Sequence, residues 1–152
     1  MISQKQYSDT KLKRKIKNFN IIHEQKIYNF QLESIENADK IGDPLKSGYL
    51  TLVDNVISEV WGKFSQDFIV RHILSASRIL LLWNQDCLVA FTTANNKVIG
   101  GKNVLYIEFT AVQKDYQHLG ISRRINFLLH YTNRRNCRFS DLQFKTGKNF
   151  HG

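Results

Sequence analysis

Apolar residues between positions 49 and 76 recur every three or four residues, which is the spacing of one helix face. The residues of the first such face are Tyr49, Leu52, Val53, Val56, Ile57, Val60 and Trp61. Gly62 follows this face, where a helix end is expected. Ser65 is a favourable N-cap for a second helix over about 66–76. The pattern therefore predicts two consecutive helices.

The apolar runs after residue 77 are continuous and short, which favours strands. Two of them, 78–83 and 87–93, flank a polar turn and predict a hairpin. A polar, glycine-bearing link over 94–103 leads to a third run, VLYIEFTAV (104–112), in which both faces are largely apolar. A strand of this kind is typical of the centre of a sheet that is covered on both sides, so we expect 104–112 to be a central strand.

The remaining elements are an early strand within 19–35, a helix over about 121–132 and a last short strand at 141–146. The predicted order is strand, helix, helix, three strands, helix, strand. This order indicates an α/β chain with an α+β-like mixed sheet flanked by helices. We expect one domain over 21–152, preceded by a basic N-terminal extension over 1–20.

The charge of the chain points to an anionic partner. A formal net charge of +9 suits nucleic acid, a membrane surface or a phosphorylated small molecule, but it is silent on the fold. The basic run KLKRKIK (11–17) is either a solvated helix face or frayed arm, or a nucleic-acid contact. No apolar run is long enough for a membrane span or a signal peptide, so we expect no membrane association and a cytoplasmic location. Two cysteines fifty residues apart show no metal-ligand spacing.

The turn QHLGIS (117–122) joins the third apolar run to the helix that follows it. A strand that leads directly into a helix directs the free N–H groups of the first helical turn, and the positive end of the helix dipole, at one place. Such a place binds phosphate well. Gly120 lets the backbone approach a ligand closely, and the small Ser122 keeps the first turn open. The turn is therefore a candidate pyrophosphate cradle, although a plain strand-to-helix turn is the alternative.

The run FTAVQKDYQHLGISRRINFLL (109–129) resembles motif A of the GCN5-related N-acetyltransferases, in which a loop of the form Gln/Arg-x-x-Gly-x-Gly/Ala joins a central strand to a helix. Ser122 stands where that motif usually has Gly or Ala. The two helices and the hairpin upstream also follow the order of the family, so that the resemblance spans roughly 45–146. It implies the acyl-CoA N-acyltransferase fold and acetyl-CoA as co-substrate, without a metal.

The resemblance also implies a role for individual residues. Backbone groups of Ala111 and Val112 would pair with the pantetheine arm of acetyl-CoA. Arg123 or Arg124 would reach its phosphates, unless these side chains are simply solvated. The backbone amides that would hold the pyrophosphate belong to Gln117, His118, Leu119, Gly120, Ile121 and Ser122.

The reaction implied by the resemblance is direct attack of a primary amine on the acetyl thioester, which needs a base. Glu108 is the carboxylate inside the strand 104–112, and burial between apolar neighbours would raise its pKa to a useful value. The alternative is that Glu108 pairs with a cation across the sheet. In the family a general-acid Tyr lies after the fifth strand, and the chain ends soon after 141–146. We therefore expect a domain truncated after its fifth strand, with reduced activity.

Two further functions stay open from the sequence. A basic nucleic-acid-binding module is favoured by the +9 charge, by 11–17 and by the cluster RRNCR (134–138), but no known nucleic-acid motif accompanies them. The second alternative is a noncatalytic interaction protein that keeps the acetyltransferase-like fold. The amine acceptor is not indicated by any residue. A sheet edge left bare by the short C-terminus would favour a homo-oligomer.

Overall fold

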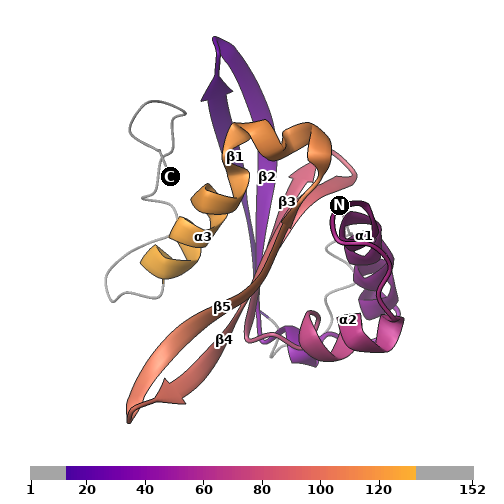
Figure 1. The fold of residues 1–152 in the computed structure, drawn as a ribbon, viewed down its shortest axis with the longest axis vertical. Coiled ribbons are helices and arrows are strands. Elements are labelled where there is room, and N and C mark those ends of the chain that lie inside the picture. Colours follow the sequence, from indigo (N-terminus) through magenta and orange to yellow (C-terminus); the bar gives the residue numbers. More distant parts are fainter. Residues whose placement is uncertain (1–12, 133–152) are drawn as a thin grey trace.

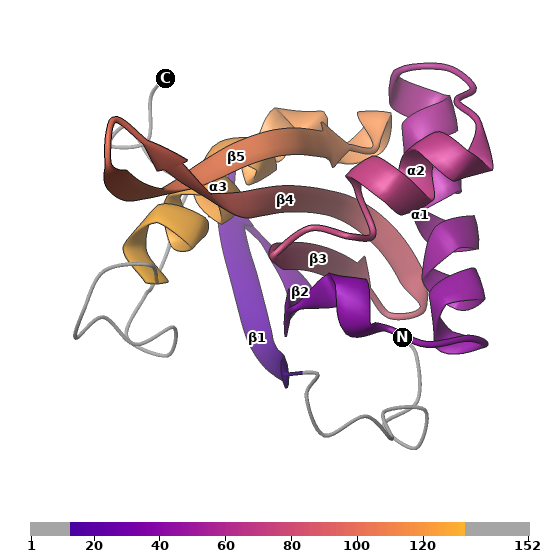
Figure 2. The same cartoon turned by 90° about the horizontal axis from the view of Figure 1, so that it is seen from below.

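The structure is a computed structural model, and it describes residues 13–132. The chain forms three layers, with α3 on one face of a five-stranded sheet and α1 and α2 on the other (Figures 1 and 2). The strands are β1 (Lys13–His23), β2 (Lys26–Glu36), β3 (Arg78–Asn84), β4 (Cys87–Ile99) and β5 (Lys102–Val112). The helices are α1 (Leu45–Val60), α2 (Gln66–His72) and α3 (Ile121–Thr132), with short 3-10 segments η2 (Ala38–Lys40) and η3 (Lys114–Leu119).

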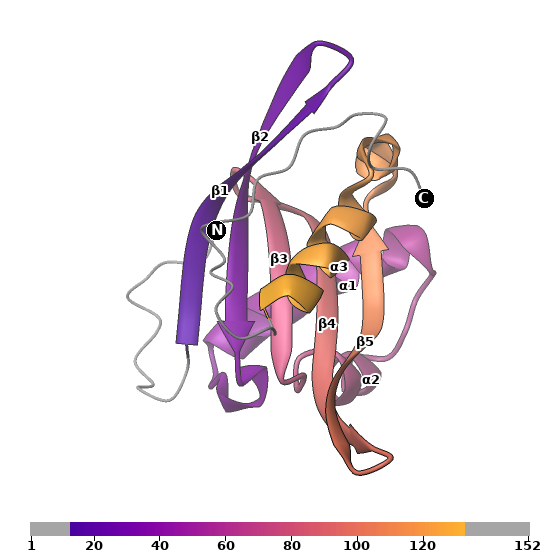
Figure 3. The ribbon, with the colours of Figure 1, turned by 90° about the vertical axis from the view of Figure 1, so that its left-hand side faces the viewer.

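The strands lie in the order β1-β2-β3-β4-β5, and all four pairings are antiparallel (Figure 3). The expected combination of helices and sheet is confirmed, whereas no parallel pair occurs among residues 13–132. The strand predicted at 141–146 lies outside the described residues. Short turns join β1 to β2, β3 to β4 and β4 to β5, and such turns require antiparallel neighbours. β2 is connected to its antiparallel neighbour β3 through η2, α1 and α2.

Three sequence-based expectations differ from the structure. Residues 13–20, assigned to the N-terminal extension, belong to β1 and pair with β2 along its length. The expected polar link over 94–103 is instead the outer half of the β4–β5 hairpin, closed by Gly100 and Gly101, both with positive φ. The run 104–112 forms most of β5, which is the last strand of the described sheet and not a central one.

The predicted helices on the α1–α2 face are confirmed. α1 buries Tyr49, Val53 and Val56 against the sheet. α2 begins after Ser65, whose hydroxyl accepts a hydrogen bond from the backbone N–H of Phe68 at 3.1 Å. This bond satisfies one of the free donors of the first turn. α2 ends at His72, four residues earlier than expected. In residues 13–132, no helix has the length and apolar character needed to cross a membrane.

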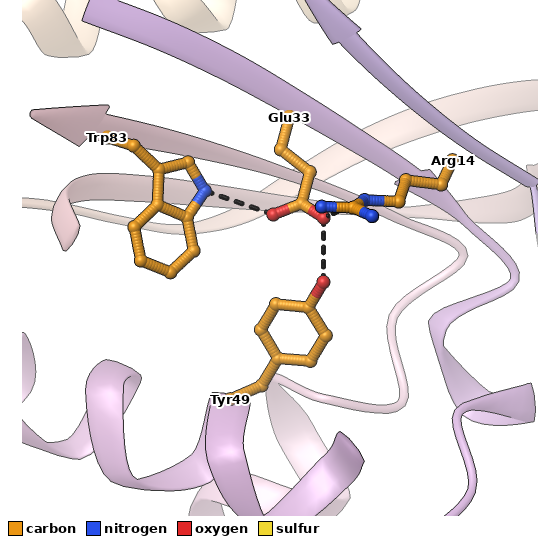
Figure 4. Close-up of polar contacts among 4 residues, drawn as sticks. All are labelled: Arg14, Glu33, Tyr49 and Trp83. Atoms are coloured by element: carbon orange, nitrogen blue, oxygen red, sulfur yellow. Dashed lines mark hydrogen bonds and ion pairs between the residues drawn. The ribbon is translucent and has the colours of Figure 1, made fainter. Parts of the chain in front are cut away.

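A buried carboxylate ties the first strand to the core (Figure 4). Glu33 on β2 is fully buried, and Arg14 of β1 donates to its Oε2 at 2.6 Å. Tyr49 Oη donates to the same oxygen at 2.7 Å, and Trp83 Nε1 donates to Oε1 at 3.0 Å. One side chain therefore connects β1, β2, β3 and α1. Arg14 lies in the basic run 11–17, so this cation has a structural partner.

Candidate functional site

The turn after β5 is built by backbone contacts at both of its ends. The N–H of Gln113 donates to the carbonyl of Val89 at 2.8 Å, which continues the β4 contact past the end of β5. The chain then forms η3 and reaches Gly120 in the left-handed region, with φ 69° and ψ 28°. This conformation strains residues that have a Cβ atom, so glycine is the suitable residue at this position. α3 begins at the next residue.

Buried and exposed residues alternate through this turn. Leu119 and Ile121 are each 1% exposed and pack into the core between the sheet and α3. Gly120 lies between these two anchors and is exposed, as are Gln117 and His118. The anchors fix the path of the backbone, while the glycine faces solvent without a side chain. The sequence-predicted cradle is thus a rigid turn at the N-terminus of a 12-residue helix.

The two arginines of the first α3 turn have different surroundings. Arg123 is exposed, whereas Arg124 is 3% exposed. Arg124 Nε donates to the carbonyl of Leu119 at 3.4 Å, and burial lowers the pKa of its guanidinium. Arg124 therefore supports the turn from inside, and Arg123 is the arginine that faces solvent beside Ser122.

The outer edge of β5 has no neighbouring strand in the described part of the chain. The bond from Gln113 to Val89 shows that odd-numbered residues at this end of β5 direct their backbone groups to β4. Ala111 pairs with Phe91 of β4, so its backbone groups lie on the β4 side of the strand. Thr110 and Val112 direct their backbone groups outward instead. The carbonyl of Val112 already accepts a hydrogen bond from Gln117 Nε2 at 3.0 Å.

Glu108 lies at an irregularity of β5, four residues before Val112. The register of β4 and β5 shifts here, with Thr93 opposite Phe109 and Ala94 opposite Ile107, so that Glu108 has no residue opposite it. Such bulges often redirect a side chain beside a functional site. At about 3.4 Å per strand residue, Glu108 and Val112 are about 14 Å apart along the strand.

The charge state of Glu108 differs from the expectation. Lys97 Nζ on β4 lies 2.8 Å from Glu108 Oε1, and this bond lowers the pKa of the Glu108 carboxyl. Burial acts in the opposite direction, but its effect is smaller. The expected rise in pKa is wrong, and the alternative of a cation across the sheet is confirmed. Burial was overestimated because β5 lies at the edge of the described sheet and Glu108 keeps 20% of its side chain exposed.

Aromatic side chains gather between α1, α2 and β5, on the face that carries Phe109. The rings of Trp61 and Phe68 lie 6.2 and 6.0 Å from the ring of Phe109. Phe64 and His72 flank Phe68, at 5.2 and 4.6 Å. Trp61 and Phe64 are each 39% exposed, which leaves one side of this aromatic cluster open to solvent. The helix pattern included Trp61, but only the folded chain shows that these rings lie beside β5.

Within residues 13–132, no three His, Cys, Asp or Glu side chains are placed to hold a metal ion. No protein-family model matches the sequence, and no curated protein matches it. Among solved structures, the chain is similar to a crystal structure of a possible acetyltransferase from Clostridium difficile 630. The two share 16% sequence identity over 80% of this chain and 82% of the other, with a TM-score of 0.44.

Proposed function

We propose that the chain is an N-acetyltransferase that moves the acetyl group of acetyl-CoA to a primary amine. The observation that carries this proposal is the exposed Gly120, held in the left-handed region between two buried anchors at the start of α3. A backbone cradle without side chains at a helix N-terminus suits a pyrophosphate. The motif A resemblance of the same residues supports this ligand. The edge of β5, which has no neighbouring strand within residues 13–132, supports pantetheine pairing at Thr110 and Val112.

The proposed roles follow the order of the residues along β5 and the turn. The backbone amides of 117–122 bind the pyrophosphate, and Arg123 contributes a solvent-facing cation. The acetyl group then lies along the edge of β5 towards Glu108. The amine nitrogen attacks the thioester carbon, the carbon–sulfur bond breaks, CoA leaves as the thiol, and the amine loses a proton.

Glu108 is the base in this proposal, but the Lys97 ion pair changes how it would act. Lys97 Nζ is itself a primary ammonium, bound 2.8 Å from the carboxylate. An acceptor amine in its protonated form has the same chemistry and would compete for the same oxygen. The acceptor would therefore reach Glu108 by displacing Lys97, and the open side of the aromatic cluster is the surface nearest this path.

The test of the cradle uses two variants of equal shape. Gly120→Asp and Gly120→Asn place similar side chains in the same left-handed conformation, and a Cβ atom there has 3.9 Å to the nearest heavy atom, Arg124 Nε. Both variants should carry a similar backbone strain of about 1–2 kcal/mol. Only the aspartate adds a negative charge. Two unit charges about 5 Å apart repel by about 3 kcal/mol at an effective dielectric constant of about 20.

Calorimetric titration with acetyl-CoA then compares the two variants. We expect Gly120→Asp to bind about a hundredfold more weakly than Gly120→Asn, which corresponds to about 2.7 kcal/mol. Equal affinities for the two variants would mean that no phosphate group lies near Gly120. Circular dichroism of both proteins controls for loss of folding.

A further inference from the structure

A groove of about 760 Å³ lies where the β1–β2 hairpin extends past the end of β3. Figure 3 shows this hairpin projecting beyond the rest of the sheet. Its walls come from the outer part of the hairpin, the β3–β4 turn and η3. Six of its lining residues carry a side-chain amide: Asn18, Asn20, Asn29, Gln31, Asn84 and Gln85. Its other lining residues are Lys26, Ile27, Tyr28, Phe30 and Tyr116. Its size lies within the range of about 300–1,000 Å³ that is usual for ligand pockets.

The main chain of β2 is open towards this groove. β2 pairs with β1 from Lys26 to Glu36, but with β3 only from Gln31 onward. His23 and Lys26 flank a two-residue turn whose residues both have positive φ, so this pair exchanges both of its hydrogen bonds. Alternation along β2 then directs the N–H and C=O groups of Ile27 and Asn29 away from β1. No strand of the described chain lies beside these four groups.

The lining matches the polar groups of a peptide main chain. Each carboxamide offers both donors and an acceptor, as a peptide group does. Among the described residues, no carboxylate lines the groove, and Lys26 is the one charged residue that does. Ile27 and Asn29 are two residues apart, which is the repeat of a β-ladder, so the open groups favour an extended chain over a compact polar ligand.

We propose that this groove binds an extended peptide, which adds to the sheet beside β2 in the space that β3 leaves open. The open part of β2, from Lys26 to Phe30, is about 17 Å long at about 3.4 Å per residue. It therefore accommodates a segment of about five residues. Addition of a strand to an open edge derives its affinity from main-chain hydrogen bonds. Asn84 and Gln85, on the wall opposite β2, would bind the peptide groups that face away from β2.

The groove borders the turn that leads to Gly120. Asn84 Nδ2 donates to Tyr116 Oη at 2.9 Å, and the Tyr116 ring lies 5.8 Å from the ring of Phe30. Tyr116 belongs to η3, and its backbone N–H donates to the carbonyl of Gln113 at 2.9 Å. A bound peptide would contact one side of η3. The peptide site stands independently of acetyl-CoA binding, because it rests on β2 and on the amide lining alone.

The test is an NMR titration of the full 15N-labelled chain with the blocked peptide acetyl-Thr-Val-Thr-Val-Thr-amide. A counterpart N-methylated at every residue, with a C-terminal dimethylamide, keeps the side chains but has no N–H donors, and maltose serves as a compact polar probe. We expect the unmethylated peptide to shift the amide signals of Ile27 and Asn29 and to slow their hydrogen exchange. The methylated peptide and maltose should leave these signals unchanged.

Two proline variants provide a matched pair of proteins. Ile27→Pro removes an N–H that faces the groove, while Ile22→Pro removes one from the opposite edge of the same hairpin, because Ile22 and Ile27 are partners. We expect Ile27→Pro to weaken the peptide by about tenfold or more and Ile22→Pro to leave its affinity within about twofold. The proposal is overturned if both variants bind the peptide equally, or if the methylated peptide binds as well as the unmethylated one. It is also overturned if maltose shifts the same amide signals, or if the unmethylated peptide leaves the Ile27 and Asn29 signals unchanged. The ligand comparison on the unaltered chain decides the question even where a proline variant fails to fold.

Discussion

Removing the cation that faces the buried Glu33 carboxylate should cost the chain a large part of its stability. Arg14→Met keeps a long apolar stem but removes the guanidinium that lies 2.6 Å from a fully buried carboxylate oxygen. Loss of one partner from a buried pair costs about 3–5 kcal/mol. Domains of ordinary stability unfold with about 5–15 kcal/mol, so this loss is a major fraction. At about 2–4 °C per kcal/mol, the Tm should fall by about 6–20 °C.

A second variant separates loss of the charge partner from loss of packing. Arg14→Met combined with Glu33→Gln removes both charges, while the amide oxygen can still accept from Trp83 or Tyr49. The double variant should therefore be more stable than Arg14→Met alone, by about 1–3 kcal/mol. Equilibrium unfolding in urea, followed by circular dichroism, measures each free energy of unfolding.

Arg71→Met is the matched control. Arg71 Nε lies 3.0 Å from Asp67 Oδ2 on the surface of α2, with both side chains about 70% exposed. This substitution should cost less than about 1 kcal/mol, because water already solvates both charges. The reasoning fails if Arg14→Met costs no more than Arg71→Met, or if the double variant is as unstable as the single one.

Three further results are expected. Lys97→Met should raise the pKa of the Glu108 carboxyl towards its ordinary value, which NMR titration of its carboxyl carbon measures; an unchanged pKa would contradict the ion pair. Because a lowered folded-state pKa stabilises the chain above the unfolded-state pKa, the stabilising effect of this pair should disappear as the pH falls through the folded-state pKa of Glu108. Replacing Lys13, Lys15 and Lys17 with alanine, with Arg14 retained, should leave the acetyl-CoA affinity in calorimetry unchanged, because β1 lies at the opposite edge of the described sheet from β5; an altered affinity would place that ligand on β1. We further propose that two chains associate through the edge of β5 that has no neighbouring strand within residues 13–132; Val104→Lys should weaken the association measured by sedimentation, and unchanged association would place the contact elsewhere.

The side-chain pattern predicted which faces of the sheet are covered, but not which strands are neighbours. The apolar residues of 104–112 do contact both helical layers, since Phe109 lies on the α1–α2 face and Ile107 on the α3 face. Lateral position in a sheet depends on main-chain pairing, which side-chain alternation does not report. The strand was therefore recognised, whereas its position at the edge of the described sheet was not.

Errors about charge arose from contacts distant in the sequence. Lys97 stands opposite Val104 on the β4–β5 hairpin, in a stretch whose polar residues and two glycines indicated a link. Because the sequence pattern did not predict this hairpin, it did not place Lys97 beside Glu108. The pKa of the Glu108 carboxyl was therefore predicted to rise, whereas Lys97 lowers it. Arg14 was similarly interpreted as part of an exposed basic run. Strands at a sheet edge often contain lysines, so a search for alternating apolar residues does not detect such strands.

The most direct measurement of the central claim is calorimetric titration of the unaltered chain with acetyl-CoA, with dephospho-CoA for comparison and thermal unfolding in parallel. We predict saturable binding, with a stabilisation of about 2.7 kcal/mol at about 100 times the Kd. Dephospho-CoA should also bind, because it retains the pyrophosphate for which we propose the turn at Gly120 as the binding site. A folded chain that binds neither compound, and gains no stability from them, would contradict the acetyltransferase proposal.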